Sequence, residues 1–89
     1  MSRKFILTEG EREEIANRIA EVIREHDYKS FREFAKDYEI PPTTLEGWIK
    51  TGNINPAFLI RFSDDFKIDL RWILKGPPYS KREKLKKNK

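Results

Sequence analysis

Large apolar residues recur at helical spacing in five stretches of the chain, and none of these stretches shows the alternation that marks a β-strand. The first stretch covers residues 9–27, and its apolar residues would give a helix one buried face. They are Ile15, Ala16, Ile19, Val22 and Ile23. Thr8 and Glu11 have the spacing of a capping box, in which each side chain bonds the backbone N–H of the other residue. We therefore predict a long amphipathic helix from about Glu9 to Asp27.

Residues 30–52 carry two shorter apolar stripes, separated by the break Glu39-Ile40-Pro41-Pro42. The stripes are, in order, Phe31, Phe34, Ala35 and Tyr38, then Leu45, Trp48 and Ile49. Ser30 and Glu33 form a second potential capping box before the first stripe. Gly52 follows the second stripe as a C-terminal cap. Two short helices joined by a turn of three or four residues are typical of the helix-turn-helix, whose second helix enters the DNA major groove.

Two further helices are predicted after Gly52. Asn55 is a favoured N-cap, and Pro56 suits the first position of a helix that runs to about Phe66. The residues expected to be buried on it are Phe58, Leu59, Phe62 and, at its end, Phe66. Asp69 can cap a last helix over residues 70–75, which Gly76-Pro77-Pro78 ends.

These patterns predict an all-α domain of five helices over residues 1–79, with the helix-turn-helix at about 30–52. Residues 80–89 form a basic tail that we expect to be disordered. A chain of 89 residues suffices for one small domain.

Charge is distributed unevenly along the chain. The net charge is +4, but residues 81–89 (KREKLKKNK) contribute +5 and leave −1 for residues 1–80. Residues 9–27 hold seven acidic residues against three arginines. Six basic residues lie in or beside the predicted DNA-facing elements: Arg3, Lys4, Lys29, Arg32, Lys36 and Lys50. The folded part therefore has no general attraction to nucleic acid, and any such attraction must come from one basic face.

Composition also bounds the location and the cofactors. The chain has no cysteine, so disulfides and thiolate metal sites are excluded. No apolar run approaches the roughly 20 residues that span a bilayer, and the apolar run near the N-terminus is too short for a signal peptide. We expect a cytoplasmic protein with no membrane contact, no metal and no cofactor.

Three blocks of sequence, KSFREFA, IPPTTLEGWIKTGNIN and KIDLRWILKGPP, resemble in this order the N-terminal domain of phage CI-type repressors. The resemblance covers about residues 29–78 and places the chain among the lambda-repressor-like helix-turn-helix proteins. It implies a transcriptional regulator, specifically a phage or prophage repressor, that binds a palindromic double-stranded DNA operator as a homodimer. If the chain is a stand-alone regulator, dimer contacts would come from the last helix and the residues after it, around Trp72, Ile73, Pro78 and Tyr79. CI-type repressors usually continue into an oligomerisation domain, so a stand-alone regulator and the DNA-binding part of a longer one both remain open.

Two positions depart from the family pattern. Glu39 stands at a turn position where the family most often has glycine in a left-handed conformation. A non-glycine residue there costs about 1 kcal/mol. Phe31 stands near the start of the first motif helix, where the family often has a glutamine that contacts a phosphate. That contact is therefore in doubt, and neighbouring residues would have to replace it.

The expected DNA contacts divide into bases and phosphates. Threonine can bond a base edge or touch the thymine methyl group, glutamate accepts from cytosine N4, and lysine bonds guanine or a phosphate. Glycine lets the helix backbone approach DNA at a cost of about 1 kcal/mol in helix propensity. The outward candidates on the second helix are Pro42, Thr43, Thr44, Glu46, Gly47 and Lys50. The candidates for phosphates are Lys29, Ser30, Arg32, Thr51 and Asn53, with Arg3 and Lys4 as a potential minor-groove arm.

Catalysis is not expected. The single histidine, His26, lies near the end of the first helix, and no glycine-rich phosphate loop or nucleophile–histidine–acid arrangement is present. No small-molecule substrate is evident. The alternative to DNA binding is a protein-interaction module of the same fold that regulates another transcription factor. The acidic first helix, Glu39 and Glu46 favour that alternative.

Overall fold

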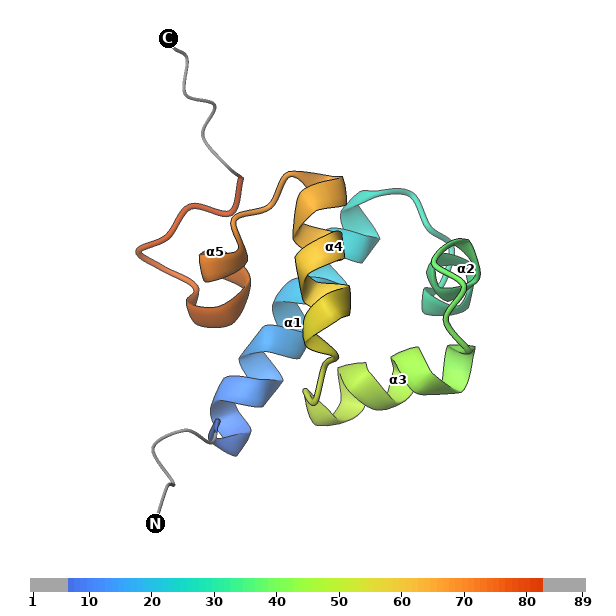
Figure 1. Ribbon diagram of the computed structural model, residues 1–89, viewed down its shortest axis with the longest axis horizontal. Helices are drawn as coiled ribbons and strands as arrows, with labels where there is room; N and C mark the ends of the chain where they lie inside the picture. The colour runs from blue at the N-terminus through green and yellow to red at the C-terminus, as the bar shows by residue number, and fades with distance from the viewer. Residues whose placement is uncertain (1–6, 83–89) are drawn as a thin grey trace, which may run out of the picture. The chain divides into compact units, whose positions relative to one another are not determined.

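The structure is a computed structural model that describes residues 7–82, and in this range it holds five helices and no strand (Figure 1). The chain divides into two compact units, Met1–Ile54 with α1 to α3 and Asn55–Lys89 with α4 and α5. The predicted all-helical class and the number of helices are confirmed for the described part of the chain. No helix between residues 7 and 82 is both long enough and apolar enough to cross a membrane.

The first helix, α1 (Glu9–Glu25), begins where the sequence predicts and ends two residues earlier. Both halves of its capping box form: the Glu11 N–H donates to Thr8 Oγ1 over 3.1 Å, and the Thr8 N–H donates to Glu11 Oε1 over 2.8 Å. The predicted stripe is buried, together with Ala20. Asp27, at φ 62°, turns the chain out of the helix.

The second helix, α2 (Phe31–Asp37), is capped differently from the prediction. Ser30 Oγ accepts the Glu33 N–H over 3.2 Å, as expected. The Glu33 carboxylate, however, accepts from the Lys29 N–H over 2.8 Å and not from that of Ser30. The reciprocal bond therefore reaches one residue further back. Phe34 is fully buried between the rings of Tyr28, at 5.2 Å and edge-on, and Tyr38, stacked at 4.6 Å.

A four-residue turn leads from α2 to α3 (Pro42–Thr51). The Ile40 N–H bonds the Ala35 carbonyl at 2.8 Å, and the Glu39 N–H bonds the Lys36 carbonyl at 3.1 Å. This pair of bonds is the Schellman motif, which needs a left-handed residue at its centre. Glu39 occupies that position with φ 57°, so the turn keeps the left-handed geometry without glycine.

The C-terminus of α3 packs directly on the first turns of α1. Gly52 ends α3 in the left-handed region with φ 77°, and its N–H bonds the Trp48 carbonyl at 2.7 Å. A Cβ atom built on Gly52 would lie 2.6 Å from the carbonyl carbon of Arg12 and would also overlap its Cβ and carbonyl oxygen. Leu45 is buried, whereas Trp48 and Ile49, also expected to face inward, are half-buried.

The second unit contains α4 (Pro56–Phe66) and α5 (Leu70–Lys75) at the predicted positions. Asn55 Oδ1 caps α4 by accepting from the Ala57 and Phe58 N–H groups at 2.8 and 3.3 Å. The rings of Phe58, Phe62 and Phe66 follow one another along α4 with centroids 5.3 and 4.9 Å apart. Leu59 and Phe66 are half-buried, against the expectation that both are buried.

The chain after α5 returns to the segment that precedes this helix. The Asp69 N–H donates to the Lys81 carbonyl over 2.9 Å, and Ile68 forms an isolated antiparallel bridge with Arg82. Lys81 and Arg82, predicted to belong to the disordered tail, are thus held by backbone pairing in this unit. The rest of the tail, residues 83–89, and the arm residues Arg3 and Lys4 lie outside the described residues.

Candidate functional site

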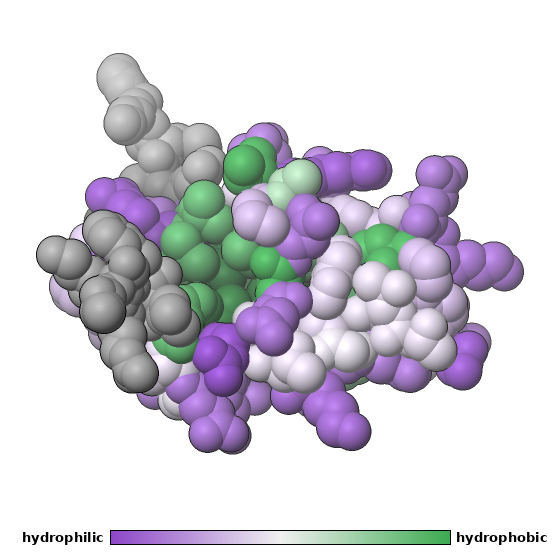
Figure 2. All heavy atoms as spheres, turned by 60° about the horizontal axis from the view of Figure 1, so that its bottom comes forward, coloured by the Kyte–Doolittle hydropathy of each residue, from purple (hydrophilic) through white to green (hydrophobic). Residues whose placement is uncertain are grey.

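The outer face of α3 carries most of the predicted contact residues. Leu45 anchors one face of α3 in the core, so the side chains on the opposite side of the helical projection turn outward. Thr43, Thr44, Glu46 and Lys50 are exposed, and Pro42 and Gly47 are half-exposed. Figure 2 brings the side of α3 forward and shows pale, weakly polar atoms over this helix with strongly hydrophilic side chains at the rim.

The N-terminus of α3 is open. Its N-cap is Pro41, and no side chain of residues 7–82 caps the helix. The Thr44 and Leu45 N–H groups bond the Pro41 carbonyl, at 2.9 and 3.2 Å. The amide of Thr43 at the start of the helix is thus left to an external acceptor, and a helix N-terminus favours an anion such as a phosphate.

Gly47 lies in the middle of α3 with open space where its side chain would be. No heavy atom lies within 4 Å of a Cβ built there. Glycine in a helix interior costs about 0.5–1 kcal/mol relative to alanine. The absent side chain leaves room for an external surface to approach the helix backbone.

Thr51 is already used within α3. Its hydroxyl donates to the Gly47 carbonyl over 2.8 Å and accepts the Asn53 N–H over 3.1 Å. A phosphate would have to displace the first of these bonds to receive the hydroxyl hydrogen. Thr51 therefore stabilises the end of α3 first, and its predicted phosphate contact carries an added cost.

Lys50 and Asn53 share a hollow of about 460 Å³ with residues of α1. Its remaining lining comes from Glu9, Arg12, Glu13 and Thr51. The carboxylates of Glu9 and Glu13 repel a phosphate and so offset the attraction that Lys50 and Arg12 exert on it in this hollow. Arg12 could not be predicted here from the sequence, because nothing in a linear pattern shows that α3 ends against the first turns of α1.

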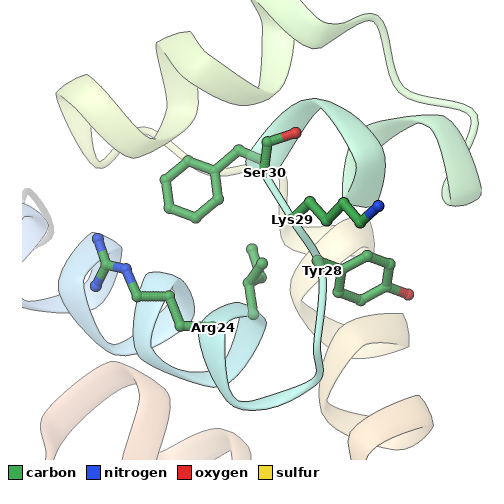
Figure 3. Close-up of a pocket in the computed structure, with 6 residues that line it drawn as sticks. Arg24, Tyr28, Lys29 and Ser30 are labelled. Carbon is green, nitrogen blue, oxygen red and sulfur yellow. The ribbon is translucent and has the colours of Figure 1, made fainter.

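A second, smaller hollow lies where α1 ends and α2 begins (Figure 3). Lys29 and Ser30, two predicted phosphate contacts, line it together with Arg24, which the sequence analysis passed over. Arg24 belongs to the acidic first helix, and the composition of that helix gave no reason to expect Arg24 in the same hollow as Lys29. Arg32, the third predicted contact on this side, is exposed in the first turn of α2.

Tyr28 adds no charge to this region at neutral pH. Burial raises the pKa of its hydroxyl, and a hydrogen bond with the Asp37 carboxylate raises the pKa further. The positive charges of Arg24 and Lys29 therefore face no phenolate.

No cluster of histidine, aspartate and glutamate within residues 7–82 has the geometry to hold a metal ion. His26 Nδ1 lies 2.8 Å from the Val22 carbonyl at the end of α1. Comparison of the chain with protein-family models, with curated proteins and with solved structures gives no significant match.

Proposed function

We propose that the chain is a sequence-specific DNA-binding transcriptional regulator that reads the major groove with α3. The observation that carries the proposal is the pair α2–α3: two short helices joined by a left-handed turn, with the second held by Leu45 and Gly52 and exposed on its other side. A helix of ten residues is about 15 Å long, which suits a groove about 12 Å wide.

Base reading is assigned to Thr43, Thr44, Glu46 and Lys50, with Gly47 allowing close approach. Phosphate contacts are assigned to Lys29, Ser30, Arg32 and Asn53, and to Thr51 at the cost described above. Ser30 Oγ accepts a backbone N–H, and its hydroxyl hydrogen can be donated to a phosphate.

The finer parts of the proposal rest on the resemblance to CI-type repressors. They are a cytoplasmic repressor of phage or prophage origin, a homodimer, and a palindromic operator with half-sites about 34 Å apart. Of the residues expected at the dimer contact, Trp72 and Ile73 are buried, while Pro78 is exposed and Tyr79 half-exposed. The exposed Leu74 of α5 joins these two as a candidate for that contact.

The test is selection from a pool of random DNA duplexes, followed by sequencing, at two salt concentrations. The full chain is compared with a version that ends at Arg82, because residues 81 and 82 pair with Asp69 and Ile68 and should be kept. We expect one enriched, two-fold symmetric site in both versions, with affinity that falls steeply as salt rises. Binding without enrichment that disappears with the tail would contradict the proposal.

The alternative is a protein-interaction module, which the exposed Glu39 and Glu46 and the carboxylates beside Lys50 favour. Combined Thr43→Ala and Lys50→Ala substitution separates the two functions. Under the DNA proposal it removes the sequence preference, since a good base contact discriminates by about 1–3 kcal/mol. Under the alternative there is no preference to remove. Exposed Lys75→Ala in α5 is the matched control.

A further inference from the structure

The hollow between the end of α1 and the start of α2 has a volume of about 250 Å³ (Figure 3). Its wall consists of Ile23 and Arg24 from α1, Phe31 from α2, and residues 28–30 between the helices. Pockets for drug-sized ligands measure about 300–1,000 Å³. This hollow is smaller, so its size suits a ligand with a single ring.

The wall combines one uncompensated cation with apolar surface. The Arg24 guanidinium lies over the Phe31 ring, 5.6 Å from its centroid, and forms no ion pair with any carboxylate of residues 7–82. Ile23, buried in the core, supplies an aliphatic wall. A cation beside a half-buried ring favours a ligand that is both anionic and flat.

The backbone N–H of Lys29 and one lone pair of Ser30 Oγ are already engaged, which leaves the Ser30 hydroxyl hydrogen as a further donor. The Lys29 N–H donates to the Glu33 carboxylate, and Ser30 Oγ accepts the Glu33 N–H. The anion partner is therefore the Arg24 side chain, because the Lys29 side chain points away from Arg24 (Figure 3). A guanidinium offers two parallel N–H groups, which match a carboxylate.

We propose that this hollow binds a small aromatic carboxylate, with the carboxylate on Arg24 and the ring against Phe31 and Ile23. A regulatory consequence rests on the proposed function: the bound anion adds negative charge beside Lys29 and Ser30 and weakens their contact with DNA phosphates. The ligand would then act as an inducer that releases the protein from its DNA site.

Binding is tested without DNA, by titrating the isotope-labelled full chain with sodium benzoate and following backbone amide resonances. We expect saturable shifts confined to about residues 23–31 and a dissociation constant on the order of 1 mM, as fits a ligand of this size. Benzyl alcohol tests the charge and cyclohexanecarboxylate tests the flat ring, and both should bind more weakly. Shifts that do not saturate, or that spread over the whole chain, would overturn the proposal.

Two variants locate the site. Arg24→Gln should weaken benzoate binding about tenfold, because it removes a charge-assisted hydrogen bond. Phe31→Leu should weaken it about threefold or more by removing the stacking surface. Arg61→Gln changes an exposed arginine of α4 that pairs with Asp65, and it serves as the control with unchanged affinity. Equal binding to the wild type and to Arg24→Gln would exclude this site.

The regulatory part is tested on the duplex enriched by selection, with benzoate compared against sodium chloride of equal ionic strength. We expect DNA affinity to fall about two- to fivefold in the wild type and to stay constant in Arg24→Gln. If benzoate binds but DNA affinity does not change, the regulatory part is wrong. If no duplex is bound, the proposed function fails, and the amide titration still decides whether the hollow is a ligand site.

Discussion

Gly52→Ala tests how α3 is held against α1. Two costs arise from this one methyl group. A non-glycine residue in the left-handed region, where Gly52 has φ 77°, costs about 1–2 kcal/mol. The new Cβ would also press on the Arg12 backbone, 2.6 Å from its carbonyl carbon, and relieving such a contact costs about 1–3 kcal/mol.

The expected loss is therefore about 2–5 kcal/mol, a large share of the roughly 5–15 kcal/mol by which small domains are stable. The measurement is urea unfolding followed by far-UV circular dichroism. With a slope of about 1–1.5 kcal/mol per molar urea, the midpoint should fall by at least about 1.3 M.

Two further variants separate the costs. Gly52→Asn tolerates the left-handed conformation but keeps the overlap with Arg12, so it should recover only a small part of the loss. Gly47→Ala places the same methyl group in open space inside α3 and should raise stability by about 0.5–1 kcal/mol. A Gly52→Ala midpoint within about 0.3 M of the wild type would refute the close packing of α3 on Arg12.

Three other substitutions have defined outcomes. Glu39→Gly should raise the free energy of unfolding by about 0.5–1 kcal/mol, because Glu39 has φ 57° in the Schellman turn; a lower urea midpoint would contradict this. Glu13→Gln should increase DNA affinity about two- to fivefold at low salt and little at high salt, because it removes a carboxylate beside Lys50. Glu21→Gln, outside that hollow, is its control in the same binding assay. Asp69→Asn should lower the urea midpoint at neutral pH, because the Arg71 side chain bonds the Asp69 carboxylate and lowers its pKa. A lowered pKa stabilises the fold above the unfolded value and loses this effect as the pH falls through the folded value. The difference between Asp69→Asn and wild type should therefore shrink as the pH falls below the ordinary aspartate value of about 3.9.

The features that the sequence predicted well are those that depend on neighbours along the chain. The Thr8–Glu11 capping box, the Asn55 and Asp69 caps and the Gly52 end of α3 all form as expected. Each needs only residues within three or four positions of one another, and the chemistry of a cap is the same in any fold.

The features that were missed depend on contacts distant in sequence. The pairing of Ile68 with Arg82 joins residues fourteen positions apart, and no periodicity marks it. The Arg12 contact under Gly52 requires the path of α3 back to α1. The acidic composition of the first helix gave no reason to expect a role for Arg24. In the structure Arg24 lies in the last turn of α1 and lines the same hollow as Lys29 and Ser30.

The composition of α3 makes any reading by this helix depend on these distant contacts. Its sequence, PTTLEGWIKT, contains proline, glycine and three threonines, and a ten-residue helix of such residues is marginal in isolation. Burial of Leu45 and close contact between Gly52 and Arg12 must therefore hold the helix in place. A base-reading surface needs a rigid support, so under the proposed function Gly52→Ala should weaken sequence-specific binding although Gly52 touches no base. Preference for the selected duplex should fall in Gly52→Ala. In Gly47→Ala it should persist only if the bases leave room for the alanine methyl group at position 47. Loss of preference in both variants would mean that DNA approaches α3 closely at Gly47. Loss of preference in Gly52→Ala alone would mean that sequence reading depends on the anchoring of α3 against α1.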